Sequence, residues 1–180
     1  MQSIVNGKRY GLATVFGLIS GCLVHTSLVA FGVSAIIKES DILFFILKLF
    51  GASYLLFLAF KIYKSNEALT LNSNAIPKKS MFQLFKQGFI MNVLNPKVSI
   101  FFLAFFPGFL FSDHLKTVYQ FYILGFLFML VSFIIFSAIA ILAGVISEYI
   151  KQNSRIGLYL KWLQIIVFIG IAFLILISEK

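Results

Sequence analysis

The sequence alternates between long apolar runs and short polar stretches that hold most of the charged residues. A helix needs roughly 20 apolar residues to cross the hydrocarbon core of a bilayer. Five runs qualify as crossings, namely 11–37, 42–60, 88–111, 117–146 and 162–177. Outer-membrane strands alternate apolar and polar positions, whereas these runs are continuously apolar. Because lipid offers the backbone no hydrogen-bond partners, the pattern predicts an all-α membrane protein, a polytopic helical bundle of five spans.

The third run, 88–111, is interrupted by polar residues. Pro96 has no backbone N–H and clashes with the preceding turn, so it should break the helix and leave carbonyls such as that of Asn92 short of a donor. Asn95 suits the N-cap of a second half-helix that begins at Pro96. The positive dipole end of that half-helix lies close to Asn92, Asn95 and Lys97. These residues predict a pocket for an anionic group, such as a substrate carboxylate, at a broken helix.

Other polar and small residues within the runs allow structural as well as functional roles. His25, near the middle of the first run, could relay a proton or form a hydrogen bond that only supports packing. Lys48, in the second run, could act at a site or extend its ammonium toward the interface. Pro96 and the asparagines could likewise only kink a span or bond between helices. Gly17 and Gly21, one helical turn apart, suit close helix packing.

Composition makes lipid the solvent for most of the chain. Of the 180 residues, 61% are apolar and only 12% charged, and the mean hydropathy is +1.01. A soluble domain averages about a quarter charged residues. The formal charge of +9 raises nucleic acid as a partner, but the basic residues lie mostly between the apolar runs. We therefore expect a single transmembrane domain, 1–180, in contact with the bilayer and not with nucleic acid.

The basic residues also predict the orientation, because cytoplasmic connections are enriched in Lys and Arg. One set of alternating connections holds ten of them and the other set only three. The ten are Lys8, Arg9, Lys61, Lys64, Lys78, Lys79, Lys86, Lys151, Arg155 and Lys161. The N-terminus and a polar loop at about 61–81 should therefore be cytoplasmic, and the C-terminus should be outside.

The sequence carries no recognisable catalytic motif. Its six acidic residues lie in connections or at span ends, so no carboxylate cage is expected inside the membrane. The single cysteine, Cys22, allows no disulfide framework, and neither a phosphate loop nor a nucleophile elbow is present. We expect no enzyme activity, no metal and no cofactor. The lack of membrane carboxylates favours a neutral zwitterion over a cation as the substrate.

Three stretches together resemble a known family. The most specific is Asn-Val-Leu-Asn-Pro-Lys at 92–97, followed by Phe-Phe-Leu-Ala-Phe-Phe-Pro at 101–107. A second stretch, 47–65, is similar to the family's third helix, and a third, 3–25, is similar to the connection into its second helix. The matching positions of the second stretch are Lys48, Gly51, Tyr54 and Leu58. Nearly the whole chain thus resembles the LysE/RhtB exporters, which move lysine, homoserine, threonine and related amino acids out of bacteria.

The resemblance implies a secondary transporter of the bacterial inner membrane that exports amino acids or similar small zwitterions, coupled to the proton gradient. It also implies six spans in two inverted repeats of three. Asn92, Asn95, Pro96 and Lys97 would then bind the substrate. Tyr54 joins His25 and Lys48 as a proton relay or polar support, and Gly51 joins the packing glycines.

The chain departs from the family pattern at two places. Family members begin with one further helix, which carries a Gly-Pro-Asn or Gly-Pro-Asp turn, and this sequence starts just after the place of that turn. Many relatives also have an acidic residue where this chain has Cys22, which leaves His25 or Lys97 for proton coupling. The alternative function is a truncated, non-transporting paralogue or a partner subunit that packs against another membrane chain. A bundle this thin would gain buried area by pairing, so a homodimer is among the expected assemblies.

Overall fold

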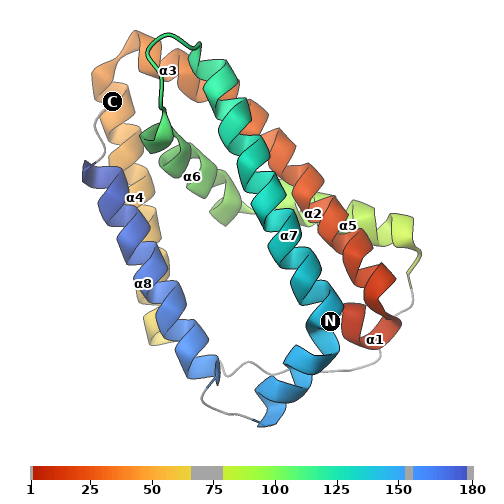
Figure 1. The fold of residues 1–180 in the computed structure, drawn as a ribbon. Helices are drawn as coiled ribbons and strands as arrows, with labels where there is room; N and C mark the ends of the chain where they lie inside the picture. Colours follow the sequence, from red (N-terminus) through yellow and green to blue (C-terminus); the bar gives the residue numbers. More distant parts are fainter. Residues whose placement is uncertain (1, 66–78, 153–155, 178–180) are drawn as a thin grey trace.

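The computed structural model describes residues 2–65, 79–152 and 156–177, and helices dominate these ranges (Figure 1). The short helix α1 (Gln2–Asn6) precedes α2 (Lys8–Leu28), which continues through a π-helical turn, η1 (Val29–Val33), into α3 (Ser34–Glu39). The remaining elements are α4 (Asp41–Lys64), α5 (Met81–Val93), α6 (Pro96–Phe105), the 3₁₀ turn η2 (Phe106–Phe109), α7 (Thr117–Gln152) and α8 (Ile156–Ile177).

The helical membrane architecture predicted from the sequence is confirmed. Four helical segments are long and apolar enough to cross a membrane: Lys8–Ile36, Ile42–Lys64, Thr117–Ile146 and Ile156–Ile177. A fifth crossing is formed if the pair Met81–Val93 and Pro96–Phe109, which is bent by 55° at its break, is one span. The break falls at Asn95–Pro96, where the sequence predicts it.

Two helices begin earlier than the apolar runs, because an apolar run marks contact with lipid and not the extent of a helix. α8 begins at Ile156, before the apolar run that starts at Trp162. α5 begins at Met81, where Ser80 and Gln83 form a capping box by binding each other's backbone N–H groups. Most of the predicted polar loop, 66–78, and the last residues, 178–180, lie outside the described residues.

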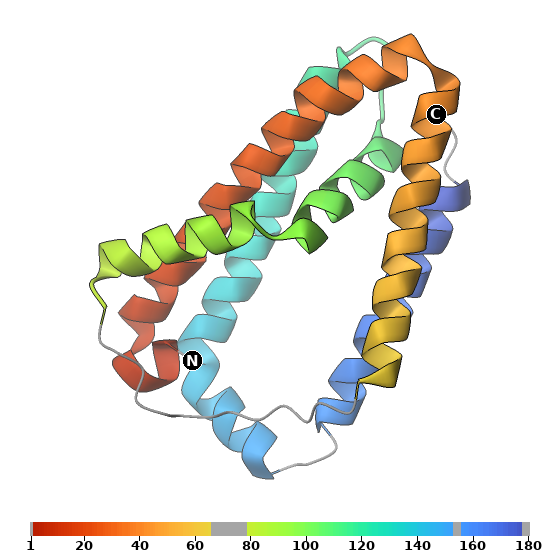
Figure 2. The same ribbon diagram turned by 180° about the vertical axis from the view of Figure 1, so that it is seen from behind.

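The helices form two groups that α6 joins. In one group α2 packs against α5 and α7, and in the other α4 packs against α8 (Figures 1 and 2). Lys161 of α8 donates to the backbone carbonyl of Ser65 at the end of α4, over 2.6 Å. α6 contributes Phe102 to the buried cluster of the first group and Ala104 to that of the second. The broken helix is therefore the structural link between the groups.

Glycines allow α2 and α5 to cross at backbone contact. A Cβ atom on Gly17 would collide with the backbone carbonyl of Phe85. A Cβ atom on Gly88 would collide with the carbonyl of Thr14, and one on Gly21 would lie 2.8 Å from the Cβ of Asn92. Small residues at a crossing bring two helix backbones together, and here they bring α2 close to the end of α5.

This crossing predicts opposite effects for the same substitution at two helical glycines. Gly17→Ala should lower the melting temperature of the detergent-solubilised protein, because overpacking costs about 1–3 kcal/mol. Gly170→Ala is the matched control, since its Cβ meets no atom within 4 Å, and it should raise stability by about 0.5–1 kcal/mol. Equal melting temperatures for the two variants would contradict the close crossing.

Candidate functional site

The backbone N–H groups in the first turn of α6 are all bonded to a single residue, Asn95. Its side-chain oxygen accepts the backbone N–H of Lys97 over 3.0 Å. Its backbone carbonyl accepts the N–H groups of Val98 and Ser99, both over 3.1 Å. Because Pro96 has no N–H, these bonds use the donors at the start of the half-helix. A carboxylate arriving here would have to displace the Asn95 side chain to reach a backbone amide.

His25 of α2 reaches across to the end of α5. In an unbroken helix the carbonyl of Asn92 would accept the N–H of residue 96, which proline lacks. Instead it accepts the Asn95 N–H over 3.0 Å and lies 3.0 Å from the Nε2 atom of His25. Since a carbonyl oxygen only accepts, Nε2 carries the proton of this bond. The Asn95 N–H and the histidine thus together replace the donor that the proline removes.

Ser99 connects the same imidazole to the start of α6. Its hydroxyl oxygen lies 3.4 Å from His25 Nδ1 and donates toward the carbonyl of Asn95 over 3.2 Å. His25 is only 2% exposed, and its ring packs against that of Phe102. The buried network therefore binds α2 to both arms of the broken helix. Sequence reasoning missed Ser99, because a serine one turn after a cap has no distinguishing signal.

Lys97 connects the break to the second helix group. Its ammonium lies 4.3 Å from the centroid of the Phe168 ring of α8, within the range of a cation–π interaction. The Lys97 side chain is half-buried. In this conformation Lys97 holds α6 against α8. Four cavities of about 420–600 Å³ open on the protein, and none of these four is lined by Asn95 or Lys97.

The Asn92 side chain lies in the interface of α2 and α5. Its amide donates to the sulfur of Cys22 over 3.7 Å. Its side-chain oxygen is buried and has no hydrogen-bond partner among the described residues. Asn92 is itself 8% exposed and packs against Gly21. Cys22 therefore contacts the same asparagine whose carbonyl binds His25.

The predicted residues of α4 lie on the other side of α6. A Cβ atom on Gly51 would collide with Ala104 of α6, so α4 and α6 approach closely at this glycine. The ammonium of Lys48 lies 5.7 Å from the ring of Phe44, and the ring of Tyr54 lies near that of Phe57. Among the described residues, no cluster of three His, Cys, Asp or Glu side chains could hold a metal ion.

These features define a polytopic membrane protein with a buried polar network at a broken helix. The chain belongs to the LysE type translocator family, whose family model matches residues 1–179. It is therefore a transporter of the membrane and not an enzyme. No solved structure gives a significant match.

The chain is also similar to curated bacterial proteins. It is 34% identical over 149 residues to a homoserine/homoserine lactone efflux protein of Salmonella typhi, covering 83% of this chain and 71% of that protein. The protein of the same name from Salmonella typhimurium is 33% identical over the same coverage. An uncharacterized membrane protein of Vibrio cholerae is 30% identical over 158 residues, which cover 84% of this chain and 75% of that protein.

The cap geometry predicts that Asn95 stabilises the broken helix. Asn95→Ala removes the acceptor of the Lys97 N–H, and loss of an N-cap side chain costs about 0.5–2 kcal/mol. The melting temperature of the detergent-solubilised protein should fall accordingly. Asn95→Ser keeps a capping oxygen and should restore most of the loss. If alanine and serine gave the same melting temperature, the cap would not contribute to stability.

Proposed function

We propose that the chain is a secondary transporter that exports amino acids or similar small zwitterions across the bacterial inner membrane. The observation that carries this proposal is the buried network at the Asn95–Pro96 break, in which two helix ends and His25 meet. Interrupted helices are the usual place for substrate and ion sites in secondary transporters. The homoserine efflux activity named for two relatives supports an amino-acid substrate.

In this proposal Lys97 is the main contact for the substrate carboxylate. Its ammonium lies over an aromatic ring, an interaction that a carboxylate can replace with a stronger charge-assisted bond. Moving Lys97 away from Phe168 also releases a contact between α6 and α8. Substrate binding would in this way loosen the link between the two helix groups. Asn92, Asn95 and Pro96 shape the site, and the Asn95 side chain can yield the Lys97 N–H to the substrate.

His25 is the proposed proton carrier. With a neutral ring, the single Ser99 hydroxyl proton faces two acceptors, His25 Nδ1 and the carbonyl of Asn95. A proton on Nδ1 would let the ring donate to Ser99 and leave the Ser99 proton for Asn95, so that every group is satisfied. Cys22 and Lys97 are the titratable residues nearest this network along α2 and α6. Proton uptake would thus change the bonds that hold the start of α6.

The orientation rests on the basic residues. α1, the start of α2, the end of α7 and the start of α8 lie at one end of the molecule, and the loop between η2 and α7 lies at the other (Figures 1 and 2). The first end carries the basic connections, which favour the cytoplasmic side. The 110–116 loop and the C-terminal end of α8 would then face outward, and export would run from the first end to the second.

Export can be tested in a bacterial host that lacks its own homoserine exporters. Expression of the full chain should raise resistance to homoserine and lower its concentration in the cell. Lys97→Met should reduce the efflux rate about tenfold or more, because a hydrogen bond to a charged group contributes about 1.5–3 kcal/mol. Lys86→Met, an exposed lysine on α5, is the control and should transport like the wild type. A wild-type chain that gives no efflux would refute the proposal.

Proton coupling can be tested separately in proteoliposomes with an imposed pH gradient. The wild-type protein should move labelled homoserine faster when the gradient drives export. His25→Gln keeps an amide donor near Asn92 but cannot take up a proton. It should transport homoserine down its own concentration gradient and lose the response to the pH gradient. If the response survives in His25→Gln, another group carries the proton.

A further inference from the structure

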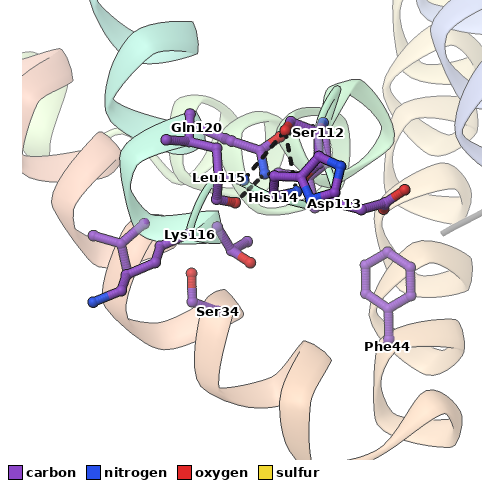
Figure 3. Close-up of a pocket in the computed structure, with 11 residues that line it drawn as sticks. Ser34, Phe44, Ser112, Asp113, His114, Leu115, Lys116 and Gln120 are labelled. Atoms are coloured by element: carbon purple, nitrogen blue, oxygen red, sulfur yellow. Dashed lines mark hydrogen bonds between the residues drawn. The ribbon is translucent and has the colours of Figure 1, made fainter.

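A polar cavity lies at the end of the molecule away from the basic connections. It has a volume of about 490 Å³ and lies beneath the loop between η2 and α7 (Figure 3). Its lining comes from the start of α3, from α4, from the 110–116 loop and from the start of α7, and it includes Ser34, Phe44, Ser112, Asp113 and Lys116. None of these residues belongs to the network at the broken helix.

Gln120 of α7 gives the loop a defined shape. Its side-chain oxygen accepts the N–H groups of Phe111 and Ser112, over 2.7 and 3.0 Å. Its side-chain nitrogen donates to the carbonyls of Ser112 and Leu115, both over 2.7 Å. Gln120 is only 2% exposed. A buried amide with four bonds holds the loop in place, so the side chains at the cavity mouth are presented by a preformed backbone.

Three polar side chains of the cavity have no partner in the part of the chain that the structure describes. The Ser34 hydroxyl is buried in a residue only 5% exposed, yet it makes no hydrogen bond. Asp113 and Lys116 line the same cavity but form no ion pair with each other or with another described residue. In Figure 3 the Ser34 hydroxyl points toward the loop, while Asp113 extends toward Phe44 and Lys116 toward the opposite side.

We propose that this cavity binds the exported amino acid as a free zwitterion on the outer side of the membrane. Asp113 would accept hydrogen bonds from the ammonium group. Lys116, whose exposed side chain extends the other way in this conformation, would turn inward to donate to the carboxylate. The Ser34 hydroxyl would gain from the substrate the hydrogen bond that it lacks in the protein. Phe44 offers an apolar surface to the substrate side chain. The proposal rests on the proposed function, because it makes the cavity an exit site beyond the broken helix. The headgroup of phosphatidylethanolamine has the same two charges, so the experiment must separate the two sources.

The experiment measures how external solutes slow efflux from intact cells. An exporter-deficient host expressing the full chain is loaded with labelled homoserine, and the initial efflux rate is followed with homoserine or homoserine amide added outside. Lys116→Met should raise the external homoserine concentration that halves efflux by roughly threefold to fivefold, as expected for an exposed ion pair. It should leave the value for the amide unchanged, because the amide has no carboxylate. Asp113→Asn should raise both values.

Two further variants separate binding from structure. Ser34→Ala should raise the half-inhibitory concentration of homoserine without lowering the melting temperature, because the hydroxyl has no protein partner to lose. Lys86→Met removes the same charge as Lys116→Met at the other end of the molecule and should change nothing. The internal homoserine concentration that gives half-maximal efflux should stay at the wild-type value in all four variants.

The failures of the two proposals are distinguishable. No efflux from wild-type cells would refute the exporter itself. Normal efflux with unchanged external inhibition in Lys116→Met and Asp113→Asn would overturn the exit site alone. The same assay in a host without phosphatidylethanolamine identifies the lipid alternative. A lipid site would give a different pattern. Wild-type efflux would then differ between hosts with and without phosphatidylethanolamine, and Lys116→Met and Asp113→Asn would remove that difference without changing the inhibition by external homoserine. In that case the cavity binds a lipid headgroup and the proposal is wrong.

Discussion

The hydrogen bond between His25 and the carbonyl of Asn92 is the interaction on which the centre of this protein depends. Pro96 removes the N–H that this carbonyl would otherwise bind, and lipid supplies no substitute. The N–H of Asn95 supplies one donor, and His25 of α2 supplies a second. The histidine can reach only because Gly17 and Gly88 let the backbones of α2 and α5 touch. The break, the histidine and the glycines therefore depend on one another: the proline leaves the carbonyl short of a donor, the histidine supplies one, and the glycines bring the two helices close enough for the bond.

Sequence reasoning reached the features that depend on local chemistry. The apolar runs predicted the spans, and Asn-Pro predicted the cap and first residue of α6, because capping and proline geometry involve neighbouring residues only. It could not assign His25 to Asn92, which lies 67 positions away. It also could not place Lys97 against Phe168, since continuous apolar helices give no periodic signal for the face that meets another helix. Ser99 and the Gln120 loop depend on the same tertiary placement.

The Asn95 cap has a consequence for any anion that binds at the break. The N-terminal amides of α6 are already bonded to Asn95, so the site without substrate contains no row of free donors. An anion gains only the difference between its own bonds and those it displaces. In the proposed function, selectivity would therefore come from Lys97 and from the shape around Asn92, because a bare helix end would accept any small anion. Because these amides are already bonded, the helix end also avoids the cost of unpaired backbone N–H groups in the membrane.

Polar groups occur at two levels of the fold, and an apolar layer separates them. His25, Asn95 and Ser99 form the inner level, and Ser34 with the Gln120 loop forms the outer one. Between them pack Val29 and Val33 of η1, Phe121 of α7, and Phe102 and Phe106 of α6 and η2, all nearly or fully buried. A solute that passes from one level to the other has to displace this layer. Since Phe102 lies on the same short helix as Lys97, a rotation of α6 at the break moves the lysine and the aromatic ring together. In the proposed function, a change at the Asn95–Pro96 break would therefore affect the polar site and the apolar layer together.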